Sequence, residues 1–145
     1  MPISEICNRE VIIAQCDETV LVASKLMRER KVGTVVVVEE HEGVRVPIGI
    51  VTDRDLVVEI IASEVDPTFI RIGDIMVREL ATVKGSCGVF EGIQYMRSKG
   101  VRRLPVVDDD GSLLGIVTLD DLLGLLAEEL SALAKLVERE RKNAP

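Results

Sequence analysis

The spacing of apolar and polar residues predicts a helix and then a buried strand in the first quarter of the chain. Val20, Ala23 and Met27 recur at helical intervals within residues 19–31, and the residues between them are largely charged. This arrangement is typical of an amphipathic helix with one face on a core. Residues 34–38 are β-branched throughout, which favours a strand covered on both faces.

A second strand and a second helix complete this first series. Apolar residues at 46–51 predict the strand, and Thr52 begins a helix that should end near Ser63. The helical period predicts four inward-facing residues, Leu56, Val57, Ile60 and Ile61. Asp66-Pro67 then ends the series as a linker.

The same series of elements returns in the second half of the chain. An Asp-Gly pair at its centre is typical of a hairpin turn between two strands. The predicted elements are an extended segment at 80–83, a helix at 87–99, a strand at 104–107, a turn at 108–111, a strand at 113–117 and a helix from 118 to about 141.

The residues themselves repeat as well as the pattern. The octet Gly49-Ile-Val-Thr-Asp-Arg-Asp-Leu56 returns as Gly115-Ile-Val-Thr-Leu-Asp-Asp-Leu122, with six of eight positions identical. One β-α-β-β-α unit of about 60 residues is therefore used twice. A single unit leaves one sheet face uncovered, so we predict an α/β (α+β) fold in which two units pack sheet to sheet about a pseudo-twofold axis. The units should span residues 1–66 and 67–124, followed by a helical extension at 125–145.

Composition and charge restrict the function. The chain has 145 residues, is 47% hydrophobic and carries a formal net charge of −7. Such an acidic chain is a poor match for nucleic acid or an anionic membrane as its main partner, since both require a basic surface. It also lacks an apolar run of about 18 residues and a signal-like start. We therefore expect a cytoplasmic protein that does not enter the membrane.

The reactive side chains do not form a catalytic or metal-binding pattern. Cys7, Cys16 and Cys87 have no metal-ligand spacing and are expected to be free thiols, and His41 is the single histidine. Without a nucleophile-base pair, we predict no enzyme, no catalytic residue and no metal site. The acidic run at 108–110 is interpreted as a hairpin turn in preference to a cation site.

The octet, the repeat and the element order together resemble the cystathionine-β-synthase (CBS) domain, found in pairs as the Bateman module. The second copy is close to the family pattern in Asp74-Ile-Met76 and in the run from Met96 to Asp108. The first copy departs from it, with Gly33-Thr34 where the second has Arg102-Arg103. The resemblance covers about residues 1–124 and implies tandem CBS domains.

The resemblance also implies a function. CBS pairs usually regulate, binding adenosine-containing ligands such as AMP, ADP, ATP or an NAD-like molecule in clefts between the two motifs. In the family, the Thr and Asp of the octet contact ribose and phosphate. Thr52 and Asp55 would then serve one cleft and Thr118 and Asp121 the other.

The two clefts are expected to be unequal. The family often has a phosphate-binding basic residue at the position of Arg103, which we group with Thr118 and Asp121, and its counterpart in the first copy is Thr34. Neighbouring residues of a strand point to opposite faces, so only one of Arg102 and Arg103 should enter a given cleft. The family match favours Arg103.

Each Thr-x-x-Asp has a second interpretation. At the start of a helix this spacing resembles a capping box, which would serve only to begin the helix. The two roles can coexist, because a cap leaves the carboxylate partly free. The alternative function is a structural dimerisation or interaction module without ligand.

An apolar stripe marks the last helix, at Leu126, Leu130, Leu133 and Val137. It could fold back along the module, but we favour a homodimer whose interface uses this helix and whose paired modules form a disc. The effector that such a module regulates would be a separate protein or another copy.

Overall fold

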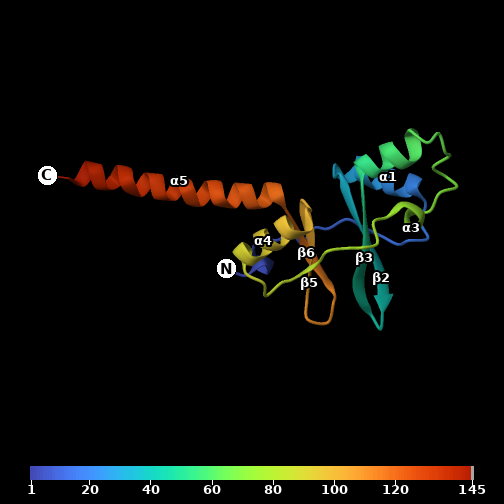
Figure 1. Ribbon diagram of the computed structural model, residues 1–145, viewed down its shortest axis with the longest axis horizontal. Helices are drawn as coiled ribbons and strands as arrows, with labels where there is room; N and C mark the ends of the chain where they lie inside the picture. Colours follow the sequence, from blue (N-terminus) through green and yellow to red (C-terminus); the bar gives the residue numbers. More distant parts are fainter. Residues whose placement is uncertain (145) are drawn as a thin grey trace.

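Two similar halves and one long projecting helix make up the molecule (Figure 1). The computed structural model describes residues 1–144. Pro145, the last residue of the predicted extension, lies outside the described residues. Each half contains a three-stranded sheet, and the two sheets lie side by side in the centre of the body, where β3 and β6 contact each other.

The first half follows the predicted order. Its sheet runs β1-β2-β3, with β1 parallel to β2 and β2 antiparallel to β3. The elements are β1 (Ile13–Ala14), α1 (Val20–Arg30), β2 (Thr34–His41), β3 (Val44–Thr52), α2 (Asp53–Leu56) and the π-helical turn η2 (Val57–Ile61).

The second half repeats this topology. Its sheet runs β4-β5-β6 with the same parallel and antiparallel pairings. The register shifts between Val37 and Val38 and at the equivalent Val106 and Val107, so even the irregularity of the hairpin is repeated. The elements are β4 (Val83–Lys84), α4 (Val89–Lys99), β5 (Arg103–Val107), β6 (Leu113–Thr118) and α5 (Leu119–Asn143). The predicted fold class is therefore confirmed.

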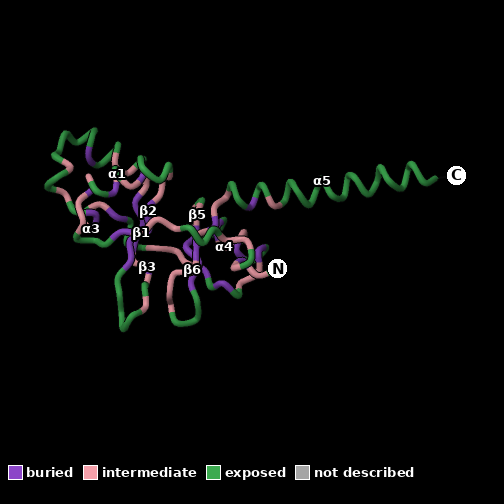
Figure 2. Tube along the Cα trace, turned by 180° about the vertical axis from the view of Figure 1, so that it is seen from behind, coloured by how far each residue is buried: buried purple, intermediate pink, exposed green. Residues whose placement is uncertain are grey.

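Helices cover the outer side of each sheet, and the predicted core is largely confirmed (Figure 2). Val20, Ala23 and Met27 are buried as predicted. The prediction that Val57 and Ile61 face inward is wrong, because both are exposed. The π-helical turn has wider hydrogen-bonded loops than an α-helix, so side chains after Leu56 no longer follow the 3.6-residue period.

Each core is completed by a segment from the other half of the chain. Ile3, in the short helix η1 (Ile3–Glu5), is buried in the core of the second half. Ile72 and Met76, at the helix α3 (Ile72–Ile75), are buried in the first half. The division of the chain into two domains at residue 66 stays a prediction, because each core includes a segment from the other side of that boundary.

The first glycine of each octet lets the exchanged segment pass over the sheet. A Cβ on Gly49 would lie 2.6 Å from Met76 Sδ, and one on Gly115 would lie 2.5 Å from the main-chain oxygen of Asn8. On the second sheet the segment is fixed by backbone hydrogen bonds between Asn8 and Ile116, 2.8 and 2.9 Å long. Glycine, which has only a hydrogen in place of a side chain, therefore allows close packing at this position of the octet.

The helix α5 was predicted to end near residue 141 and ends at Asn143. Its first turns pack on the body, and the remainder projects away from it, exposed on all sides (Figures 1 and 2). The fold-back alternative is therefore wrong. Within residues 1–144, α5 and the other helices are too short or too polar to cross a membrane.

Candidate functional site

Both octets form capping boxes. Thr52 Oγ1 accepts a hydrogen bond from the Asp55 main-chain N at 3.3 Å, and Asp55 Oδ2 accepts one from the Thr52 main-chain N at 2.8 Å. Thr118 and Asp121 make the same pair of bonds at 3.2 and 3.1 Å. The capping interpretation is confirmed. It uses one oxygen of each carboxylate, and the second oxygen makes no hydrogen bond with residues 1–144.

A cavity of about 250 Å³, called here the Arg103 cleft, lies between the two halves. Thr52 and Asp55 line it from the start of α2, and Arg103 lines it from the first residue of β5, with Arg102 just before that strand. Apolar side chains supply most of the remaining surface: Ile50, Val77, Leu80, Ala81 and Val101. The cleft thus combines a carboxylate and a hydroxyl with two guanidinium groups on an apolar floor.

Arg103, which lines this cleft, has an unsatisfied donor. Its Nε is buried and has no hydrogen-bond partner among residues 1–144. No carboxylate of the same residues lies within 4.0 Å of its guanidinium nitrogens. A buried donor without a partner costs about 1–3 kcal/mol, and more when it is charged. An anionic acceptor placed in the cleft would remove that cost.

The grouping of Arg103 differs from the one expected from the sequence. Arg103 and Thr118 are neighbours across β5 and β6, but the cleft that Arg103 lines contains Thr52 and Asp55 in place of Thr118 and Asp121. The sheets of the two halves lie against each other, so the arginine at the start of β5 faces the octet of the opposite half. The octet and its arginine therefore come from different halves.

Only one of the two arginines was predicted to enter a given cleft, and the structure places both residues on the lining of the Arg103 cleft. Alternation of side chains holds within a strand, and Arg102 lies just before β5 begins. Its main-chain oxygen instead accepts a hydrogen bond from the Leu119 N at 2.8 Å, where α5 starts.

A second cavity, of about 710 Å³, occupies part of the equivalent place in the other half of the repeat. Before the hairpins, equivalent positions of the two copies are 69 residues apart. Five residues of the Arg103 cleft therefore have their equivalents on the wall of this second cavity: Val77, Glu79, Leu80, Ala81 and Val101 correspond to Asn8, Glu10, Val11, Ile12 and Val32. Thr34, Thr118 and Asp121 do not line it. Thr34 is the cross-strand neighbour of Thr52. Of the six predicted site residues, the structure thus brings together Thr52, Asp55 and Arg103.

The segment from Val77 to Ala81 was missed by sequence reasoning. It lines the Arg103 cleft and includes Glu79, a second carboxylate on its wall. This segment follows the exchanged helix α3 and pairs with the first sheet through Val77 and Ile50. It forms no regular element and has no motif, so its place depends on the exchange of segments, which the local pattern does not reveal.

The acidic run at 108–110 forms the predicted turn between β5 and β6. Asp110 Oδ1 accepts hydrogen bonds from the Ser112 hydroxyl at 2.6 Å and from its main-chain N at 2.9 Å. These bonds hold the pKa of Asp110 below its ordinary value. Among residues 1–144, no group of three or more His, Cys, Asp or Glu side chains is arranged to hold a metal ion.

The three cysteines are free thiols in the structure. Cys16 is exposed, and Cys7 and Cys87 are half-buried. Burial raises the pKa of Cys87, and the Glu91 carboxylate, which accepts a weak hydrogen bond from its thiol, adds to the rise. A thiol held protonated in this way is a poor nucleophile.

Comparison with known proteins places these features in context. The CBS domain model matches residues 3–62 and 72–128. An uncharacterized protein of Methanopyrus kandleri is 40% identical over 121 residues, covering 83% of this chain and 60% of the relative. The chain thus spans less than two thirds of that relative's length.

Solved structures share the fold. A hexameric CBS-CP12 protein from bloom-forming cyanobacteria superposes with a TM-score of 0.74 at 31% identity, covering 85% of this chain and 66% of that one. The CBS domain pair of protein MJ0100, crystallised with 5-methylthioadenosine and S-adenosyl-L-methionine, gives a TM-score of 0.75 at 24% identity and covers 89% and 98%. At that identity the second likeness concerns the fold alone.

Proposed function

Because this chain belongs to the CBS domain family, we propose that it is a regulatory module that binds an adenosine nucleotide in the Arg103 cleft. CBS-domain pairs are regulatory modules, and the finer assignment rests on one observation. Arg103, whose buried Nε lacks a partner among residues 1–144, lines the same cavity as Asp55, which has a free carboxylate oxygen. A cationic donor and an anionic acceptor in one cavity match the two ends of a nucleotide.

The chemistry of each wall fits one part of the ligand. A carboxylate oxygen accepts hydrogen bonds from both hydroxyls of a ribose, as Asp55 Oδ1 can while Oδ2 caps the helix. A guanidinium binds phosphate by paired charge-assisted hydrogen bonds, the role we give to Arg103 with Arg102 beside it. The apolar floor suits adenine. At about 250 Å³ the cavity is slightly smaller than the usual range of about 300–1,000 Å³, so part of the ligand stays in solvent.

The arginines decide which adenosine ligand is favoured. AMP, ADP, ATP and an NAD-like ligand all carry phosphate, whereas 5-methylthioadenosine carries none. The 5-methylthioadenosine in the MJ0100 structure belongs to that protein. With two guanidinium groups on one wall of its cleft, this chain should prefer the phosphate-bearing ligands.

The wider proposal concerns location and partners. The module acts by binding and has no catalytic step of its own. It is a cytoplasmic homodimer, and it passes the bound state of its cleft to a separate effector protein or to another copy. Nucleic acid and membrane are not its main partners. A ligand-free interaction module is the second candidate, favoured by the exposed apolar face of α5.

Calorimetric titration tests the first proposal. AMP, ADP, ATP, NAD and 5-methylthioadenosine would be titrated into the unaltered chain and into Arg103→Gln, with Arg54→Gln as the matched control, since Arg54 is exposed on α2 and does not line the cleft. Arg103→Gln should weaken nucleotide binding by about 1.5–3 kcal/mol, the range for a hydrogen bond to a charged group. It should change 5-methylthioadenosine binding little.

Two results would contradict the proposal. Equal nucleotide affinity in Arg103→Gln and Arg54→Gln would remove Arg103 from the site. Absence of binding for all five ligands at millimolar concentration would favour the ligand-free interaction module.

A further inference from the structure

A regular apolar seam runs along α5 and is left uncovered over most of its length. Leu130 and Leu133 are 69% and 61% exposed. The seam residues alternate at intervals of four and three, the heptad pattern that packs against another helix: Leu119, Leu123, Leu126, Leu130, Leu133 and Val137.

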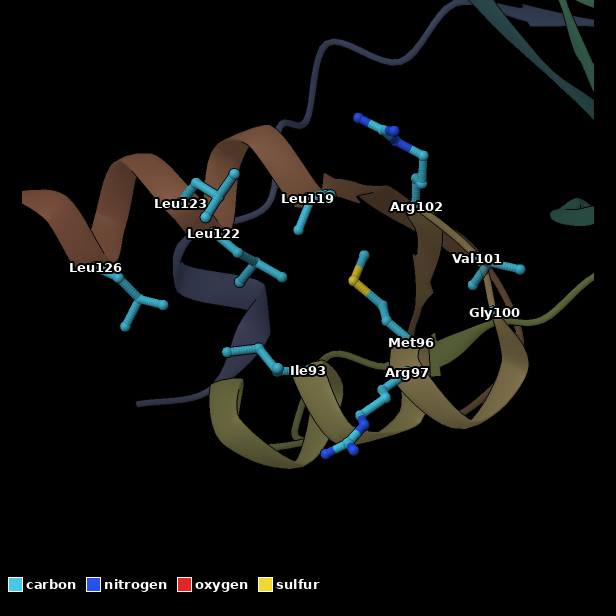
Figure 3. A pocket seen from close by; sticks show the side chains of 10 residues that line it. All are labelled: Ile93, Met96, Arg97, Gly100, Val101, Arg102, Leu119, Leu122, Leu123 and Leu126. Atoms are coloured by element: carbon cyan, nitrogen blue, oxygen red, sulfur yellow. The ribbon is translucent and has the colours of Figure 1, made fainter.

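The seam continues into a cavity on the body. A cavity of about 370 Å³ lies between the first turns of α5 and the helix α4, and its apolar walls include Leu119, Leu123 and Leu126 (Figure 3). Two basic residues, Arg97 and Arg102, also line it. One continuous apolar surface therefore begins between α4 and α5 and extends along the projecting helix.

Charge is distributed unequally along α5. From Leu119 to Leu130 the helix has four acidic residues and no basic one, and from Ser131 onward it has four basic residues and two acidic ones. The helix macrodipole favours such a gradient, but only within the first and last turns. Glu129 lies further inside and beside the seam, so the macrodipole does not account for it, and Asp120 and Arg141 flank the seam near the two ends of the helix.

We propose that two copies of this chain pair through α5 in antiparallel orientation, about a twofold axis close to Ser131 and Ala132. This inference rests on the proposed homodimer and specifies the helix pair that forms its interface. Asp120, beside the seam in the acidic first half of each helix, then lies close to Arg141 in the basic second half of its partner. Charge complementarity therefore selects a second copy as the occupant of the seam.

The register follows from the heptads. In this orientation Leu130 packs on the partner's Leu133, and Leu126 packs on the partner's Val137. The small residues Ala127 and Ala134 also come together beside the seam, which allows the two helices to approach closely. Each contact occurs twice, because the interface is symmetric.

The antiparallel orientation also accounts for Glu140, a charged residue at a seam position near the end of α5. Glu140 follows Val137 in the heptad pattern, where an apolar residue is normal. In the antiparallel pair it reaches the α4–α5 cavity, where Arg97 can receive its charge. In a parallel pair the two Glu140 side chains would instead face each other across the seam, where like charges destabilise.

Light scattering at a series of concentrations tests the interface. The intact chain should have the mass of a dimer. Leu130→Glu should raise the dimer dissociation constant by at least about 30-fold, as for a central interface residue. Ser131→Glu adds the same charge one position away, outside the seam, and should leave the dimer intact. A dimer that persists in Leu130→Glu would overturn the interface.

A distance measurement tests the orientation. Asn143→Cys would carry a spin label, in a chain whose three native cysteines are replaced by alanine and whose mass and nucleotide affinity match the original. The antiparallel register separates the two labels by about 34 Å along the helices, whereas a parallel pair brings them within about 15 Å. A short distance in a confirmed dimer would overturn the antiparallel arrangement and leave the homodimer standing.

The remaining outcome separates the two proposals. A monomeric intact chain would overturn both the helix pair and the homodimer. Nucleotide binding, measured by calorimetry on the same sample, would still stand or fall with the Arg103 cleft.

Discussion

Gly115→Ala should destabilise the protein, because the glycine allows the exchanged N-terminal segment to cross the second sheet. The new Cβ would lie 2.5 Å from the Asn8 main-chain oxygen and 2.8 Å from Cys7 Sγ. The nearest atom belongs to the backbone and cannot rotate away. The segment must therefore move, and its two hydrogen bonds to Ile116 lengthen or break.

The magnitude follows from these contacts. Overpacking costs about 1–3 kcal/mol, and a lost backbone hydrogen bond contributes about 0.5–1.5 kcal/mol. Since movement of the segment relieves part of the overpacking, we expect a loss of about 2–4 kcal/mol in the free energy of unfolding. For a chain of this length that corresponds to a fall of roughly 5–15 °C in Tm.

Two other glycines provide matched controls. Gly49→Ala meets the flexible Met76 side chain at 2.6 Å and the Val77 main-chain oxygen only at 3.1 Å, so the side chain can give way, the backbone shifts less and the loss should be smaller. Gly124→Ala meets nothing within 4 Å in the helix α5 and should stabilise by about 1 kcal/mol, the difference in helix propensity. The measurement is denaturant unfolding at one fixed protein concentration, since association would otherwise shift the midpoint. Equal stability of Gly115→Ala and the unaltered chain would refute the close-packing argument.

Two further predictions concern titratable groups. Iodoacetamide should modify exposed Cys16 before Cys87 near pH 8, and the rate at Cys87 should keep rising at higher pH, because burial and then Glu91 raise the pKa of that thiol. The order of modification is measured by mass mapping of the labelled peptides, and earlier reaction of Cys87 would contradict the prediction. Hydrogen bonds from Ser112 lower the pKa of Asp110, so the stability they confer is complete above about pH 4 and is lost as pH falls through the lowered pKa. The stability deficit of Ser112→Ala should therefore close in acid, and a deficit that is unchanged at low pH in denaturant titrations would argue against the hydrogen-bonded carboxylate as its source.

Periodicity and turn residues predicted most of the elements, because these signals are local. The helix at 19–31, the strands on either side of each hairpin and the capping boxes at Thr52 and Thr118 all depend on residues within a few positions of one another. The π-helical turn after Leu56 was not predicted, since no residue in it breaks the helical pattern. The turn is recognised only in the structure, where it leaves Val57 and Ile61 exposed.

The Arg103 cleft was only partly predictable for a different reason. The resemblance identified Thr52, Asp55 and Arg103 separately, and each is present in the cleft. Their grouping depends on how the sheets of the two halves face each other, and on the exchange that brings Val77 beside Ile50. These contacts join residues far apart in sequence, so they have no local signature.

The exchange of segments also changes how the inequality of the two halves should be understood. If each half built its own cleft, Thr34 in place of arginine would weaken the cleft of the first octet. The structure assigns the arginine of the second half to the octet of the first, so the octet with Thr52 and Asp55 gains the cationic wall. By the repeat, Thr118 and Asp121 would face Gly33 and Thr34, which carry no charge. A phosphate-bearing ligand is therefore expected on the first octet, and the second octet, whose carboxylate is also the more exposed, offers no cation from the equivalent position.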